Sequence, residues 1–148
     1  MNIARLLSKV SQDFSCADKI VKSGHVKGYL NAMVQHRDSS AILIRLAYIL
    51  GNLTTNFEEA RVKLCRKKAN EKSCFLIITE LACFYLEKDA QGESVGDAEK
   101  AGKNSKYQEF TTGHLEDALT KVIKLLANLS IEESVAYEEF HQMQELLN

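Results

Sequence analysis

The residues of this chain that are best suited to bind another molecule form two stripes at helical spacing. Each stripe ends in an asparagine and carries basic side chains: Arg45, Tyr48 and Asn52 in the first, and Lys121, Lys124 and Asn128 in the second. Positions three, four and seven apart share one face of an α-helix. A side-chain amide donates and accepts hydrogen bonds, and guanidinium and ammonium groups pair with acids. Each stripe is therefore expected to form one basic, hydrogen-bonding helix face.

Patterns for catalysis or metal binding are absent from the sequence. The histidines at positions 25, 36, 114 and 141 include no pair at the i, i+4 spacing of a helical metal site. No glycine-rich phosphate loop follows a strand, and no acids stand in a recognisable catalytic order. Cys65 lies in the basic run 61–72, but a cysteine without a placed base is more often inert. We therefore expect no enzyme activity and no cofactor.

Composition indicates a soluble, all-helical protein. The chain has 148 residues, of which 45% are hydrophobic and 26% charged, enough to bury one substantial core. It has no proline, and strand-like alternation is rare. The net charge of −1 gives no general attraction to nucleic acid or membrane, and the apolar windows 41–53 and 74–86 are too short to span a bilayer. The four cysteines show no CxxC spacing and Met1–Arg5 no signal-peptide character, so we expect a cytoplasmic protein with reduced thiols.

The same helical segment occurs twice in the chain. When Asn52 is superposed on Asn128, apolar residues coincide: Leu43 with Leu119, Leu46 with Val122, Ala47 with Ile123, Ile49 with Leu125, Leu50 with Leu126, and Leu53 with Leu129. Three further pairs agree in character: Arg45 with Lys121, Gly51 with Ala127, and Thr54 with Ser130. Each copy has an apolar face that only a neighbouring unit can cover, so the repeat predicts stacked helical units.

Periodicity and turn signals predict helices at roughly 3–10, 12–22, 26–35, 40–53, 57–68, 74–87, 114–129 and 131–147. The order is short helix, helix, repeated helix, twice over, and 54–56 is expected to break the first copy. Residues 88–113 hold four of the seven glycines and predict a flexible insertion, with Ser94 and Ser105 as possible phosphate acceptors. The last helix begins an incomplete third unit, so we expect a segment of a longer solenoid or reliance on a partner. Its ends, at Ile3, Leu6, Leu7, Leu146 and Leu147, would otherwise expose apolar faces.

The segments 50–54 and 126–130 resemble the armadillo-repeat family, whose third helix characteristically ends in Leu-Gly/Ala-Asn-Leu-Ser/Thr. The resemblance covers most of the chain except the insertion, although many armadillo units begin their second helix with a proline that this chain lacks. It implies an all-α, right-handed solenoid of about two units with partial flanking helices.

The resemblance also implies a binding groove. In the family, third helices line a concave surface, and their asparagines hydrogen-bond the backbone of an extended peptide. Asn52 and Asn128 match that position, while Tyr48 and Lys124 stand where peptide-binding members often have tryptophan. Together with Arg45 and Lys121, such a surface suits an acidic peptide or an acidic helical face.

Simpler interpretations of these residues remain open. An asparagine near a helix end can satisfy its own last carbonyls. Basic residues on the polar face of a helix are usually solvated. Tyr48 can fill a gap between units instead of contacting a ligand.

The leading hypothesis is a non-catalytic scaffold or adaptor that binds proteins through this groove. The longer block 49–61 resembles a family member associated with cilia and flagella, notably radial spokes of the axoneme, so axonemal subunits are candidate partners. The alternative is a structural spacer that contacts partners through its ends and convex faces. No specific nucleic-acid or membrane partner is expected.

Overall fold

The computed structural model describes residues 2–66, 71–93 and 112–131, together with residues 133, 137 and 141. The described residues form seven α-helices: α1 (Asn2–Val10), α2 (Phe14–Lys22), α3 (Val26–Gln35), α4 (Ser40–Asn56), α5 (Glu58–Cys65), α6 (Cys74–Glu93) and α7 (Thr112–Leu129). Most of the predicted insertion, with Ser94 and Ser105, lies outside the described residues. So does most of the predicted last helix, with Leu146 and Leu147.

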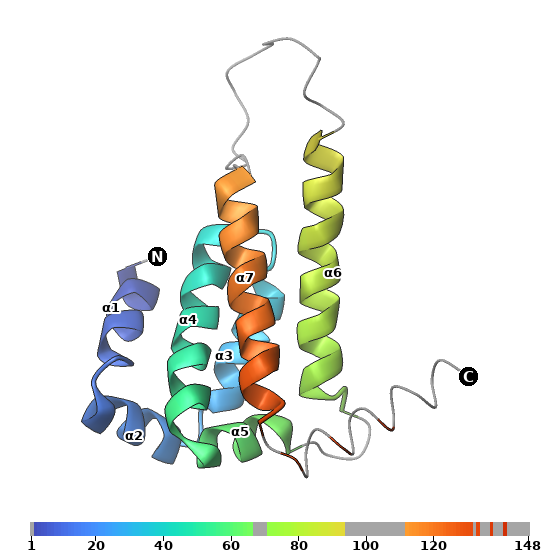
Figure 1. The fold of residues 1–148 in the computed structure, drawn as a ribbon. Helices are drawn as coiled ribbons and strands as arrows, with labels where there is room; N and C mark the ends of the chain where they lie inside the picture. Colours follow the sequence, from blue (N-terminus) through green and yellow to red (C-terminus); the bar gives the residue numbers. More distant parts are fainter. Residues whose placement is uncertain are drawn as a thin grey trace.

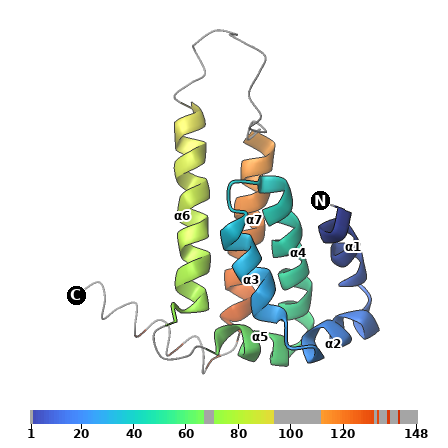
Figure 2. The same ribbon diagram turned by 180° about the vertical axis from the view of Figure 1, so that it is seen from behind.

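The helices form two units of three, preceded by α1. In each unit a short helix, α2 or α5, is followed by two further helices, and the third helices of the two units, α4 and α7, lie side by side (Figure 1). Helix α1 packs on α4 as well, so that α1, α4 and α7 form one row (Figure 1). Helix α3 lies behind this row and comes to the front in the reversed view (Figure 2). This arrangement confirms the predicted all-α solenoid and the stacking of the repeated helices.

Local sequence sets the ends of α2. The Asp13 carboxylate accepts a hydrogen bond from the Cys16 backbone N–H at 2.9 Å, as an N-cap residue does. This bond favours the ionised carboxylate and lowers the pKa of Asp13. At the other end, Gly24 has a φ of 78°, which a glycine adopts without steric strain. The helix therefore begins at Phe14, two residues after the predicted start.

The predicted break after the first repeated segment is wrong. Helix α4 continues through Thr54 and Thr55 to Asn56. The three polar side chains hydrogen-bond the carbonyls four residues earlier: Thr54 to Leu50 at 2.8 Å, Thr55 to Gly51 at 2.8 Å, and Asn56 to Asn52 at 2.9 Å. Side chains that favour turns thus satisfy the last carbonyls of the helix instead of interrupting it.

Helix α6 is longer than predicted, because it continues to Glu93 rather than ending near Glu87. The first residues of the predicted insertion, 88–93, are therefore helical, and α7 already begins at Thr112. A flexible insertion over the intervening residues stays a prediction.

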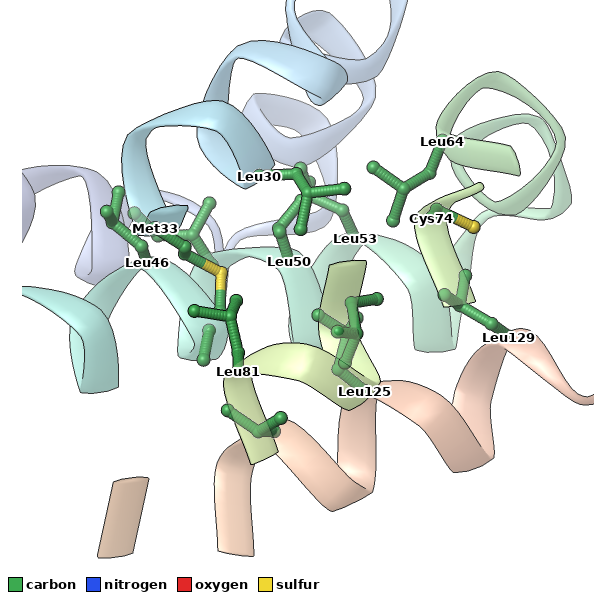
Figure 3. Packing of buried hydrophobic residues seen from close by; sticks show 14 of the residues in the cluster. Leu30, Met33, Leu46, Leu50, Leu53, Leu64, Cys74, Leu81, Leu125 and Leu129 are labelled. Carbon is green, nitrogen blue, oxygen red and sulfur yellow. The ribbon is translucent and has the colours of Figure 1, made fainter. Parts of the chain in front are cut away.

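A continuous hydrophobic core joins the two units. Helix α4 runs through its middle, and Leu43, Ile49, Leu50 and Leu53 are each 0% exposed. Figure 3 shows the α4 side chains packed among residues of the surrounding helices: Leu30, Met33, Leu64, Cys74, Leu81, Leu125 and Leu129. Because these residues come from α3, α5, α6 and α7, neither unit has a core of its own.

Candidate protein-binding groove

Helix α1 ends in a third copy of the repeated motif, which aligns with the ends of α4 and α7. The three copies share a small second residue and a hydroxyl at the end: Leu7-Ser8-Lys9-Val10-Ser11, Leu50-Gly51-Asn52-Leu53-Thr54 and Leu126-Ala127-Asn128-Leu129-Ser130. In each copy the hydroxyl donates to a carbonyl of its own helix: Ser11 to Ser8 at 3.0 Å, Thr54 to Leu50 at 2.8 Å, and Ser130 to Leu126 at 2.9 Å. Lys9 replaces the asparagine in this copy, so the copy was not recognised from the sequence. The small residue followed three positions later by a hydroxyl residue is the sequence signal that identifies it.

The two asparagines bind the neighbouring helix in the row. Asn52 Nδ2 donates to Ser11 Oγ at 2.9 Å, which ties α4 to the end of α1. Asn128 Nδ2 contacts three acceptors near the end of α4: the Gly51 carbonyl at 3.2 Å and the hydroxyls of Thr54 at 3.1 Å and Thr55 at 2.8 Å. Neither asparagine caps its own helix. Their amide nitrogens hold the row of third helices together, so hydrogen bonds from these groups to a partner would compete with internal ones.

A hollow of about 600 Å³ opens across α1, α4 and α7. It is lined by residues of all three helices, Arg5, Ser8, Lys9, Ala41, Ile44, Arg45, Tyr48, His114, Asp117 and Lys121, and by Gln12 in the turn that follows α1. Four of these side chains are permanently basic and only Asp117 is acidic. The hollow therefore favours anionic groups.

Tyr48 and Lys121 line this hollow and lie against each other. The Tyr48 hydroxyl accepts a hydrogen bond from Gln12 Nε2 at 2.7 Å, and Lys121 Nζ lies 5.4 Å from the centre of the Tyr48 ring. Lys121 also lies 3.9 Å from Asp117. Tyr48 thus connects α4 to α7 and to the turn that follows α1, while it still lines the hollow.

A second hollow of about 220 Å³ adjoins the first and shares Tyr48 and Lys121 with it. Its other lining residues come from α4 and α7: Ala47, Gly51, Asn52, Thr55, Lys124 and Asn128. We call the two hollows together the basic groove. All six residues predicted from the sequence stripes line it, and the structure adds Arg5 and Lys9 from α1. Within the described residues, Arg5, Lys9, Arg45 and Lys124 form no ion pair, so their charges are not neutralised by this part of the chain.

The basic run 61–72 serves internal contacts where it is described. Arg61 Nη1 donates to the Thr54 carbonyl at 2.8 Å, and Lys63 Nζ donates to the Val21 carbonyl at 2.9 Å. These bonds join α5 to the ends of α4 and α2. Nearby, the thiol of Cys74 donates to Cys65 Sγ at 3.1 Å, and both cysteines are buried. Cys65 is therefore a core residue in contact with a second thiol.

Two of the histidines are placed by their contacts. His25 Nδ1 lies 2.7 Å from the Ser23 carbonyl, and His114 lines the basic groove. Among the described residues, no group of three or more potential ligands could hold a metal ion. Within the same part of the chain, none of the helices combines the length and hydrophobicity that crossing a membrane requires.

Three mammalian proteins named armadillo repeat-containing protein 2 are similar to this chain. The identity is 24% over 135 residues for the Bos taurus protein, 26% over 135 residues for the Homo sapiens protein and 25% over 131 residues for the Mus musculus protein. The matches cover 90%, 90% and 88% of this chain but only 15%, 15% and 14% of the relatives. No family model and no solved structure matches the chain.

The name of these relatives denotes armadillo repeats, and the described residues of this chain form stacked three-helix units. The repeated third helix and its side-by-side packing give this chain the fold of an all-α solenoid, and its sequence is similar to that of proteins named for armadillo repeats.

Proposed function

We propose that this chain is a non-catalytic scaffold segment that holds an acidic segment of a partner protein in the basic groove. The observation that carries the proposal is the row of cations across three helices that form no ion pair within the described residues: Arg5, Lys9, Arg45 and Lys124. Asn52 and Asn128 support this groove by positioning the helices that carry these cations, and their contact with a partner peptide stays a prediction.

The shape of the groove supports an extended or helical polypeptide rather than a small metabolite. The hollow spans three helices, its walls combine charged and polar groups with a larger apolar surface, and Tyr48 offers an aromatic ring among them. Glutamate or aspartate side chains spaced along a peptide could pair with successive basic residues. Such pairs mainly set specificity and association rate, so binding should weaken as salt is added.

Charge reversal within the groove tests this proposal. A fluorescein-labelled decaglutamate peptide serves as the probe, and binding is followed by fluorescence anisotropy at low salt. The double variant Lys9→Glu/Arg45→Glu should bind the probe at least about tenfold more weakly, because two cations become repulsive.

The matched control is Lys19→Glu/Arg66→Glu, which changes the net charge equally at exposed positions outside the groove. It should reduce binding much less. If both variants lost the same affinity for the probe, the net charge of the chain and not the groove would attract the probe, and the groove would not be the binding site. Circular dichroism melts establish that each variant is folded.

We further propose a cilium or flagellum as the setting, with axonemal subunits, including those of radial spokes, among the partners. The support is the resemblance to armadillo repeat-containing protein 2. A tagged chain expressed in ciliated cells should remain with detergent-extracted axonemes, and the groove variant should be released. Uniform cytoplasmic distribution of the wild-type chain would contradict this setting.

A second candidate function is a spacer that contacts partners through its ends. The exposed apolar residues of α1 favour it, because Ile3 is 76% and Leu6 is 64% exposed. If this function holds, the groove variant should remain with the extracted axonemes, whereas the Leu6→Lys variant should be released from them.

A further inference from the structure

Two cysteine thiols from consecutive helices lie against each other in the second unit. Cys65 is the last residue of α5 and Cys74 is the first residue of α6, and they are 7% and 3% exposed. The Cys74 thiol donates to Cys65 Sγ at 3.1 Å. Because the sulfurs of a disulfide are about 2.05 Å apart, bond formation requires these two sulfurs to approach by only about 1 Å.

A hollow of about 220 Å³ opens onto both sulfurs. Among the described residues, its lining also includes Lys27, Glu71 and Lys72. Lys27 Nζ lies 3.1 Å from Glu71 Oε2, and these side chains are 40% and 44% exposed, so the hollow has a charged rim in contact with solvent. Since a water molecule occupies about 30 Å³ in the liquid, the hollow has room for a small polar reactant. The thiols are therefore buried but within reach of such a molecule.

Both cysteines stand at helix ends, where the backbone is less constrained than in the middle of a helix. The Arg66 N–H donates to the Val62 carbonyl at 2.9 Å and closes α5. The Ser73 hydroxyl accepts a hydrogen bond from the Leu76 N–H at 3.1 Å, as an N-cap residue does, where α6 begins. The movement that joins the sulfurs can therefore occur without breaking either helix.

We propose that Cys65 and Cys74 form a redox site, at which a hydroperoxide, in the simplest case hydrogen peroxide, joins them in a reversible disulfide. The Cys74 thiol hydrogen is directed at Cys65 Sγ, so Cys65 is the nucleophile and loses its own proton into the hollow. The Cys65 thiolate attacks one peroxide oxygen and the O–O bond breaks. The leaving hydroxide takes up a proton to give water, and Cys65 becomes a sulfenic acid.

The second step closes the disulfide. The Cys74 sulfur attacks the sulfenic sulfur of Cys65, the S–S bond forms, the S–O bond breaks, and a second water leaves with the Cys74 proton. The two thiols are thereby oxidised by two electrons, which reduce one hydrogen peroxide to two waters. Thiol reductants reverse the bond by exchange.

The disulfide links α5 to α6 and bridges two residues that are nine positions apart. Such a cross-link restricts the unfolded chain and so stabilises the folded one. Cys83 cannot replace Cys65, because it lies nine residues beyond Cys74 on α6, about 13 Å along the helix axis. The pair lies outside the basic groove, so the inference does not rest on the proposed function.

The test uses the full chain with the changes Cys16→Ser and Cys83→Ser, which keeps only the proposed pair. Folded protein is treated with hydrogen peroxide, the remaining thiols are alkylated, and tryptic peptides are mapped by mass spectrometry. Trypsin cleaves after Arg66 and Lys72, so the disulfide appears as one cross-linked pair of peptides. The oxidised chain should melt at least about 5 °C higher than the reduced chain, and dithiothreitol should reverse this rise.

The matched control adds Cys65→Ser to the same background. Hydrogen peroxide should then produce neither a cross-linked peptide nor a rise in melting temperature. The wild-type chain, whose folding depends on no substitution, is mapped in parallel and should contain the same link between Cys65 and Cys74. The proposal is overturned if the folded chain yields no such link, if the link forms only in urea, or if the disulfide leaves the melting temperature unchanged or lowers it.

Discussion

Helices α4 and α7 carry nearly the same sequence pattern but differ in how much of it is buried. Leu50 and Leu53 of α4 are 0% exposed, whereas only the second of the matching residues on α7, Leu129, is 0% exposed and Leu126 is half-buried. The difference arises because α4 packs between α1 and α7. Within the described residues, α7 packs beside only one helix of this row, α4. A motif therefore fixes which residues can be buried, while its position in the stack decides how many are.

The largest effect should come from truncating the matched leucines. Leu50→Ala removes a side chain that is 0% exposed, so the free energy of unfolding should fall by about 2–5 kcal/mol. Leu126→Ala removes a half-buried side chain and should cost only about 1 kcal/mol. Urea unfolding of the two variants measures the difference. Equal losses would mean that α7 is as enclosed as α4.

The next largest difference in stability is expected between alanine substitutions of the two asparagines. Asn128→Ala removes a donor with three acceptors and should destabilise the chain by about 1–2 kcal/mol. Asn52→Ala removes a donor with one acceptor, and a loss of about 1 kcal/mol is expected. Thermal melts can rank the two variants. If Asn128→Ala left the stability unchanged, the amide would have no structural role, and ligand binding would be its expected role.

The smallest effect concerns the small residue of the motif, which is Gly51 in α4 and Ala127 in α7. A Cβ atom built on Gly51 would meet nothing within 4 Å, so Gly51→Ala should stabilise the helix by about 0.5–1 kcal/mol. The reverse change, Ala127→Gly, should destabilise by a similar amount. Chemical unfolding of both variants gives the sign, and destabilisation by Gly51→Ala would show that α7 approaches α4 more closely than the structure indicates.

The candidate site could be predicted from the sequence to a useful extent. Arg45, Tyr48 and Asn52 share a helix face because helical periodicity is local, and superposing the repeat placed the α7 stripe beside them. Lys9 and Arg5 were missed because Lys9 replaces the asparagine that marks the other two copies, in α4 and α7. Only its packing against α4 shows that it extends the groove.

The sequence by itself determined the helical class, the order of helices and the identity of the repeated segment, since these depend on periodicity, turn residues and caps a few positions apart. Tertiary structure alone decided the partners of the long-range groups. It assigned the Asn128 amide to the end of α4, brought Cys65 against Cys74 and arranged the cations around one hollow. Such pairings depend on how whole helices pack, and many different packings are compatible with the same local pattern.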